Sequence, residues 1–110
     1  MKFNELIKVD EIELLNENSL RDNEIKELYI GDLLSRVIAK IDENTLWLTV
    51  QAQINALAVA CLSECPVIIF TEDVEVNADL VKKANENQIT LFKTKLTGGK
   101  LARVLVEKGL

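Results

Sequence analysis

The 110-residue chain contains no histidine, one proline and two cysteines, Cys61 and Cys65. The lack of histidine removes the commonest general base at neutral pH, and two cysteines alone cannot supply the four ligands of a structural zinc ion. We therefore expect no catalytic residue, no metal and no cofactor. The cysteines lie four positions apart on a predicted helix, so we expect reduced core thiols that share one face.

Long apolar runs and a net positive charge are also missing. No apolar run reaches the roughly 18 residues that span a bilayer, and the first residues lack the apolar core of a signal peptide, so we expect a cytoplasmic protein without a membrane partner. The net charge of −5 disfavours a nucleic-acid-binding protein. The charge is uneven: residues 93–110 hold five lysines and arginines against one glutamate, which leaves −9 on the remainder.

What the sequence does contain is a strongly apolar centre. Two β-type runs, Leu46–Val50 and Val67–Phe70, flank an almost wholly apolar segment, Ile54–Leu62. Runs that are apolar on both faces are typical of parallel strands covered by helices on both sides. We therefore predict a strand, a buried helix and a second strand, with Trp47 in the core or in a subunit contact rather than serving as a stacking platform.

The N-terminal part predicts less regular structure. Asn4 is a suitable cap for a short helix that ends near Val9. Alternating charged and apolar residues predict a strand at 11–15, a polar loop follows at 16–19, and a second strand is predicted at 25–30. We interpret the two strands as an N-terminal β layer. Asp32 is then the predicted cap of a helix over residues 33–41.

The C-terminal part alternates helices and strands. Asn77 is the predicted cap of a helix over 78–87, a strand follows at 89–92, and Thr97 is the predicted cap of a last helix that ends at Gly109. Together these elements predict one α/β domain over residues 1–110. Its central sheet is expected to be mainly parallel, with three consecutive strand–helix units preceded by the N-terminal helix and β layer.

The start of the last helix is a candidate anion site. Thr97-Gly98-Gly99-Lys100 combines a helix N-terminus, two glycines that allow close backbone approach and a lysine, with Lys93 and Lys95 nearby in sequence. This pattern suits a phosphate or carboxylate group, and an ordinary capped turn with solvated lysines explains it too. It is not a P-loop, because Thr94 and Leu101 occupy positions that the P-loop pattern reserves for other residues.

Polar residues near the central strand are further candidates. Asp32 follows Gly31 and could be a catalytic carboxylate or a helix cap. Gln51, Gln53 and Asn55 lie between the Trp47 strand and its helix, where ligands bind in open α/β sheets; capping and loop hydrogen bonds explain these amides equally well. The candidate ligand-binding residues are Thr97, Gly98, Gly99, Lys100, Lys95, Gln51, Asn55, Gly31 and Asp32.

Three segments carry a resemblance to a known family. Tyr29–Ser35 (YIGDLLS), Leu46–Gln51 (LWLTVQ) and Asn55–Ala60 (NALAVA) together resemble the DRTGG domain family, which is similar to the N-terminal domain of HPr kinase/phosphorylase. The similarity covers nearly the whole chain. The motif that names the family is eroded in the segment 22–28: Asp22 fits the motif, whereas asparagine, lysine, glutamate and leucine replace its arginine, threonine and two glycines.

The resemblance implies a non-catalytic module, often dimeric, of the kind that accompanies CBS pairs, phosphotransacetylases and pyrophosphatases. Stand-alone members resemble proteins encoded beside hydrogenase-type redox enzymes. We therefore expect a regulatory or protein-interaction module that forms a homodimer and senses a small anionic ligand of phosphate or nucleotide type. One alternative is a ligand-free scaffold partner of a larger redox enzyme such as a hydrogenase. Another is a small enzyme that acts on a phosphorylated metabolite through Asp32, Lys95 or Lys100.

Overall fold

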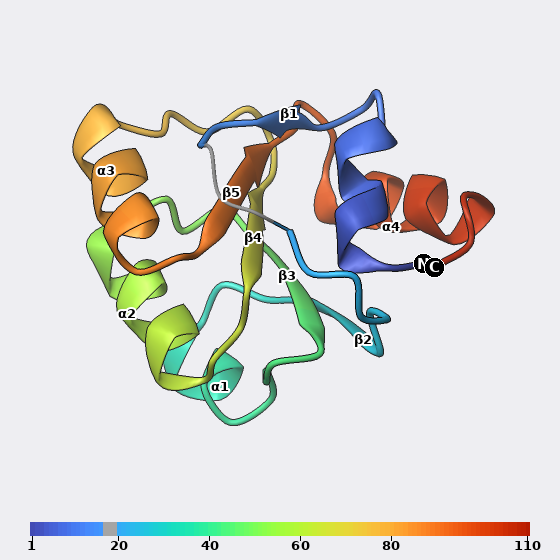
Figure 1. The fold of residues 1–110 in the computed structure, drawn as a ribbon. Coiled ribbons are helices and arrows are strands. Elements are labelled where there is room, and N and C mark those ends of the chain that lie inside the picture. Colours follow the sequence, from blue (N-terminus) through green and yellow to red (C-terminus); the bar gives the residue numbers. More distant parts are fainter. Residues whose placement is uncertain (17–19) are drawn as a thin grey trace.

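The computed structural model describes residues 1–16 and 20–110, and these residues build a three-layer α/β/α sandwich around one sheet (Figure 1). The strands are β1 (Glu13–Leu14), β2 (Glu27–Ile30), β3 (Thr45–Thr49), β4 (Val67–Phe70) and β5 (Thr90–Lys93). Their order across the sheet is β1-β5-β4-β3-β2. Strands β2 to β5 are parallel, and β1 pairs antiparallel with β5. The predicted α/β class with a mainly parallel sheet is confirmed.

Helices cover both faces of the sheet. They are η1 (Phe3–Lys8, a 3-10 helix), α1 (Leu34–Val37), α2 (Ile54–Leu62), α3 (Ala78–Glu86) and α4 (Gly98–Glu107). Helices α1, α2 and α3 pack on one face, and η1 and α4 pack on the other. The three predicted strand–helix units are therefore confirmed as β3–α2, β4–α3 and β5–α4. Within the described part of the chain, no helix is long and apolar enough to cross a membrane.

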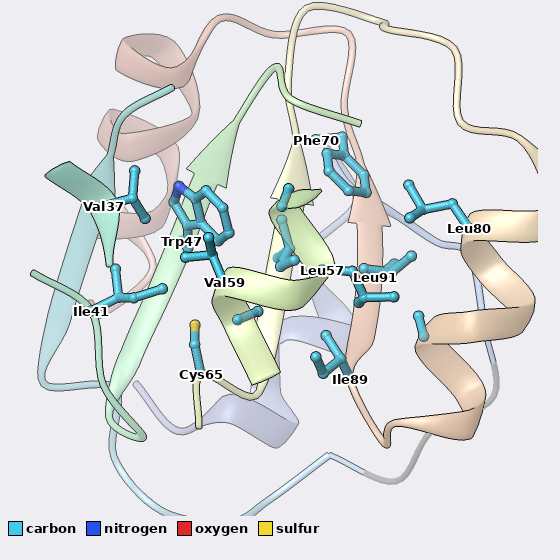
Figure 2. Packing of buried hydrophobic residues seen from close by; sticks show 14 residues of the cluster. Val37, Ile41, Trp47, Leu57, Val59, Cys65, Phe70, Leu80, Ile89 and Leu91 are labelled. Carbon is cyan, nitrogen blue, oxygen red and sulfur yellow. The ribbon is translucent and has the colours of Figure 1, made fainter. Parts of the chain in front are cut away.

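The central strand β3 is buried along its whole length. Successive side chains of a strand point to opposite faces, so Trp47 contributes to the core beneath α1, α2 and α3, whereas Leu46 and Leu48 contribute to the core beneath η1 and α4. Figure 2 shows Trp47 in the first of these cores, with Val37 and Val59 around it. The predicted core position of Trp47 is confirmed, since its side chain is fully buried.

The first helix and strands differ in detail from the prediction. Asn4 lies inside η1 rather than capping it, and the carboxylate of Glu5 accepts a hydrogen bond from the backbone N–H of Lys2 at 2.8 Å. Strands β1 and β2 do form, but they occupy opposite edges of the one sheet. Strand β1 pairs with β5 and strand β2 pairs with β3, so the two do not form a separate β layer. Residues 17–19 of the predicted loop lie outside the described residues.

The two cysteines do not share a face. Helix α2 ends at Leu62, so Cys65 lies beyond it in the turn before β4. Cys65 is buried, and its burial raises the pKa of the thiol to about 12. Cys61 is exposed, so the prediction of two core thiols is wrong for this residue. Its position on an apolar helix gave no indication that it points outward.

The predicted ends of the last two helices are confirmed. The side chain of Asn77 accepts a hydrogen bond from the N–H of Leu80 at 2.9 Å, and the hydroxyl of Thr97 accepts one from the N–H of Lys100 at 3.3 Å. Gly109 has a φ of +111°, which favours glycine, and it follows the end of α4 as expected.

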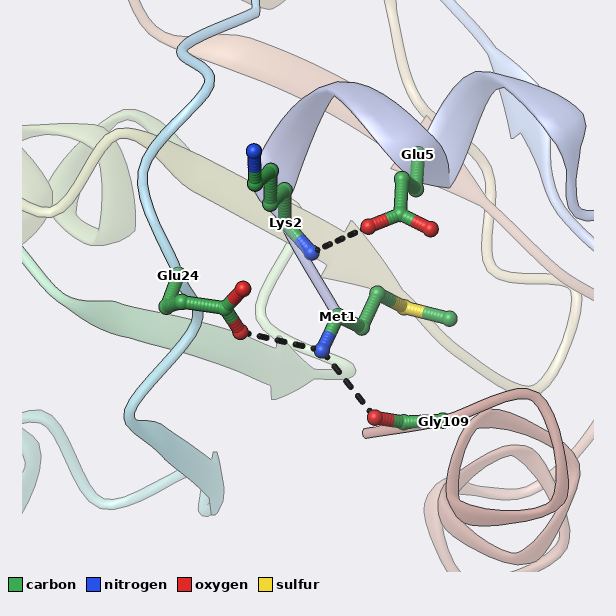
Figure 3. Close-up of polar contacts among 5 residues, drawn as sticks. All are labelled: Met1, Lys2, Glu5, Glu24 and Gly109. Carbon is green, nitrogen blue, oxygen red and sulfur yellow. Dashed lines mark hydrogen bonds and ion pairs between the residues drawn. The ribbon is translucent and has the colours of Figure 1, made fainter.

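The eroded motif segment anchors the N-terminus of the chain. The ammonium group of Met1 donates to Glu24 Oε2 at 3.1 Å and to the carbonyl oxygen of Gly109 at 3.0 Å (Figure 3). The N–H of Ile25 donates to the carbonyl of Met1 at 2.9 Å, and the N–H of Phe3 donates to that of Asn23 at 3.1 Å. This segment therefore holds the two ends of the described chain side by side.

The Trp47 side chain should contribute measurably to stability. Its indole N–H donates to the carbonyl oxygen of Gly31 at 2.9 Å. Trp47→Phe removes this hydrogen bond and leaves a cavity, so we expect a loss of about 2 kcal/mol in the free energy of unfolding. Urea unfolding followed by circular dichroism measures it. A loss below about 0.5 kcal/mol, typical of a surface substitution, would contradict this account.

Candidate ligand site at the carboxyl edge of the sheet

Because strands β2 to β5 are parallel, their carboxyl ends lie along one side of the sheet. We call this line of strand ends the carboxyl edge. In open α/β sheets ligands bind outside this edge. The predicted site residues divide into three groups along it. One group lies where β2 and β3 end, a second lies at the end of β5, and Asn55 lies apart from both on α2.

Asp32 joins the end of β2 to the end of β3. Its Oδ1 accepts hydrogen bonds from the Thr49 hydroxyl at 2.8 Å and from the Val50 N–H at 2.9 Å. The Thr49 hydroxyl in turn accepts the N–H of Gln51 at 3.1 Å. The predicted capping role of Asp32 is wrong: helix α1 covers only Leu34–Val37, and the residue at its N-cap position makes no side-chain cap hydrogen bond.

Gly31 is confined by its neighbours. Its carbonyl accepts the indole N–H of Trp47, and a Cβ atom at Gly31 would lie 2.7 Å from Cε2 of Tyr29. Only a residue without a side chain fits such an approach without displacing the ring. Gly31 therefore serves close packing, and it sets the position of the Asp32 carboxylate that follows it.

The start of α4 packs on the end of β2. Gly98 is buried, and a Cβ atom there would lie 2.9 Å from Cγ2 of Ile30. A Cβ atom at Gly99 would meet nothing within 4 Å, so the backbone at Gly99 is open to a ligand. We call the residues 30–32, 49–51 and 97–100 the β2 corner. The approach of Gly98 to Ile30 joins the two parts of the β2 corner. From the predicted set, these parts contain Gly31, Asp32, Gln51, Thr97, Gly98, Gly99 and Lys100.

Lys95 belongs to a different hollow. It lines a groove of about 350 Å³ at the end of β5, together with Lys93 and carboxylates from β1 and two loops. These carboxylates belong to Asp10, Glu11, Glu13 and Asp73. Asp73 Oδ1 lies 3.5 Å from the Lys93 ammonium. The carboxylates outnumber the lysines, so the groove disfavours an anion. Lys100 does not line this groove, so Lys95 and Lys100 would not contact the same ligand there.

Asn55 does not join either group. It is exposed in the first turn of α2, and the residue at the N-cap position of this helix, Gln53, makes no side-chain cap hydrogen bond. Gln53 instead lines a hollow of about 480 Å³ between the starts of α2 and α3.

Sequence reasoning missed Thr49, whose hydroxyl group links Asp32 to Gln51 in the β2 corner. A hydroxyl ending an otherwise apolar strand was the available signal.

The site offers no obvious metal centre. In the residues that the structure describes, no three histidine, cysteine, aspartate or glutamate side chains cluster as metal ligands would. The Asp32 carboxylate already accepts two hydrogen bonds. The β2 corner presents outward the backbone at Gly99 and four exposed side chains, which belong to Ile30, Asp32, Thr97 and Lys100.

These elements define a small α/β/α domain with a mainly parallel sheet, and the β2 corner lies at the carboxyl edge of that sheet. Residues 46–107 match the family described as HPr Serine kinase N terminus. The match covers more than half of the chain, and the chain belongs to this family. The resemblance to DRTGG-type domains is thereby confirmed.

A solved structure shows the same fold. It is the crystal structure of the CBS and DRTGG domains of the regulatory region of Clostridium perfringens pyrophosphatase, complexed with the activator diadenosine tetraphosphate. The similarity has a TM-score of 0.78 at 15% identity and covers 96% of this chain and 46% of that chain. This chain therefore spans about half the length of the other. A search of curated proteins finds no match.

Asp32 should stabilise the β2 corner. Asp32→Ala removes the acceptor for Thr49 and Val50, and we expect a loss of about 1 kcal/mol together with faster hydrogen exchange of the Val50 amide. Asp10→Ala, another exposed carboxylate, is the matched control and should change the free energy of unfolding by less than about 0.5 kcal/mol. Equal effects of the two substitutions would contradict the assigned role.

The two neighbouring glycines of α4 should respond differently to alanine. Gly99→Ala adds a methyl group in open space and improves helix propensity, so stability should be unchanged or higher by up to about 1 kcal/mol. Gly98→Ala forces Ile30 to move, so it should be less stable than Gly99→Ala by about 1 kcal/mol or more. Urea unfolding compares them. Equal stabilities would mean that α4 does not rest on β2 as described.

Proposed function

We propose that the chain is a non-catalytic regulatory module, spanning residues 1–110, that self-associates and binds a small anionic ligand of phosphate or nucleotide type at the β2 corner. The observation that carries this proposal is family membership combined with a fold shared over 96% of the chain with part of a regulatory region. That regulatory region is complexed with a nucleotide activator, which makes a nucleotide the first ligand to test.

The chemistry of the β2 corner supports an anionic ligand. The first turn of an α-helix leaves backbone N–H groups without partners inside the helix and carries a partial positive charge. At α4 this turn contains Gly99, beside whose Cα atom there is open space, and Lys100, which is exposed. Arg103, which lies one turn along α4 from Lys100, is exposed as well and adds a favourable potential. A phosphate could approach the backbone closely and meet a positive charge.

The same contacts make catalysis a weaker explanation. Asp32, the carboxylate that an enzyme would use here, is hydrogen-bonded to Thr49 and Val50. Lys95 lines a separate groove dominated by carboxylates. The sequence has no histidine to act as a base, and Cys65 is buried as a neutral thiol. These residues therefore support binding better than proton transfer or nucleophilic attack.

Ligand binding can be tested with matched lysine and arginine variants. We expect ATP or diadenosine tetraphosphate to raise the melting temperature and to shift the NMR signals of the Gly98 and Gly99 amides. A ligand at a hundredfold excess over Kd stabilises by about 2.7 kcal/mol. Lys100→Gln should weaken binding, whereas Arg21→Gln, which removes the same charge at the opposite end of the strands, should change it little. Unshifted Gly98 and Gly99 amides at millimolar nucleotide and phosphate would refute the site.

A further inference from the structure

Strand β2 leaves one side of its backbone without a neighbouring strand. It is the last strand of the sheet, and it pairs only with β3 (Figure 1). The N–H groups of Glu27 and Gly31 point to β3, where they donate to carbonyl oxygens at 3.3 and 3.2 Å. Backbone groups alternate in direction along a strand, so Leu28 and Ile30 turn their N–H and C=O groups away from β3. We call this row of groups the free edge of β2.

The free edge lacks the protection that sheet edges usually have. Edge strands are normally very short, charged, interrupted by proline or covered. Strand β1, at the opposite edge, has only two residues. In β2, residues 28–30 contain no charge and no proline, and Ile30 is 49% exposed. Among the residues that the structure describes, none donates a hydrogen bond to the outward groups of Leu28 and Ile30 or accepts one from them.

Helix α4 runs beneath β2 in the opposite direction. It begins at the end of β2, where a Cβ atom at Gly98 would lie 2.9 Å from Cγ2 of Ile30. Beyond the other end of the helix, the carbonyl of Gly109 accepts the Met1 ammonium group. The carbonyl of Met1 in turn accepts the N–H of Ile25, which lies just before β2. The helix therefore accompanies β2 over its whole length.

One flank of α4 faces outward beyond β2. On the other flank, Val104 packs in the core that η1 covers, and Lys108 Nζ lies 3.9 Å from Oε1 of Glu11, just before β1. That flank therefore faces the β1 side of the sheet. With 3.6 residues per turn, Ala102 and Val106 lie on the opposite flank, so they face the free edge of β2.

Apolar side chains line the free edge on the α4 side. Leu28 and Ile30 pair in register with two leucines of β3 that belong to the core beneath η1 and α4, so their own side chains point to that face of the sheet. Val106 is 59% exposed. We call Leu28, Ile30, Ala102 and Val106 the edge strip. A strand added at the free edge would cover this strip and meet the outward backbone groups.

The charge beside the edge strip favours a partner protein over a second copy of this chain. Arg103 is exposed on the same flank as Ala102 and Val106, and within the described part of the chain it forms no ion pair. A second copy that continued the sheet across a two-fold axis would place its own α4 on the same face, so the two Arg103 flanks would meet. A segment that carries a carboxylate would instead complement Arg103.

We propose that the free edge of β2 binds an extended segment of a partner protein, which adds a further strand to the sheet. The segment places alternate apolar side chains on the edge strip and an aspartate or glutamate beside Arg103. Main-chain hydrogen bonds to Leu28 and Ile30 hold it in register. This inference concerns a protein partner rather than an anionic ligand, so it goes beyond the proposed function.

Peptide selection on the whole chain tests the proposal. The probe is a displayed library of random peptides. We expect the selected peptides to alternate apolar and polar residues and to contain an acidic residue. A selected peptide should slow the hydrogen exchange of the Leu28 and Ile30 amides, which point away from β3. The amide of Tyr29, which points to β3, should change less.

Matched variants locate the bound peptide. Val106→Asp should weaken binding of a selected peptide roughly fivefold or more, because it removes apolar contact and repels the acidic residue. Ile7→Asp is the control, since Ile7 is 52% exposed on η1, and it should bind as the wild type does. Arg103→Gln should weaken binding about threefold. That loss should vanish for a peptide in which glutamine replaces the acidic residue. Circular dichroism checks that all three variants fold.

Several outcomes would overturn the proposal. A selection that enriches no peptide, or only peptides whose binding Val106→Asp does not weaken, would refute the docking site. A loss with Arg103→Gln that persists for the glutamine peptide would refute the acidic partner. Protection of the Leu28 and Ile30 amides that rises with the concentration of the free chain would make a second copy the occupant instead. The nucleotide titration decides the proposed ligand binding independently of these results.

Discussion

The burial of β3 on both faces is the constraint on which the rest of the structure depends. Trp47 faces one core and Leu48 faces the other, so the strand is stable only when helices cover both sides of the sheet. Connections from β3 and β4 place α2 and α3 on the Trp47 side. Helix α4 and the N-terminal η1 then cover the Leu48 side, and the sheet edge is left as the place where loops and helix starts meet.

Contacts with this core determine the geometry of the β2 corner. The indole of the buried Trp47 holds the Gly31 carbonyl, and the next residue, Asp32, holds Val50 at the end of β3. Ile30, one position earlier, supports Gly98 at the start of α4. The successive residues Ile30, Gly31 and Asp32 thus position the ends of β2 and β3 and the start of α4. A ligand at Gly99 and Lys100 would meet a surface that is ordered before it binds.

Local patterns predicted the local features of this fold. The apolar runs of β3, α2 and β4 and the caps Asn77 and Thr97 depend on neighbouring residues, so the sequence alone was sufficient. Asp32 was misassigned because its partner Thr49 lies 17 positions away and is brought near by parallel pairing. The edge position of β1 likewise depends on its pairing with β5, which lies at the other end of the chain. Most residues of the β2 corner were named from the sequence. Only the tertiary structure shows that Lys95 and Asn55 lie apart from them.

The exposure of Cys61 has the same origin as the exposure of Ile54 and Leu62 on the same helix. An apolar helix in a sequence looks the same whether the core or a partner covers its outer side, and the fold shows that the core covers only half of α2. Val50, whose N–H binds Asp32, lies four positions before α2 begins. The β2 corner and the exposed side of α2 are therefore joined by residues 50–53 of the chain.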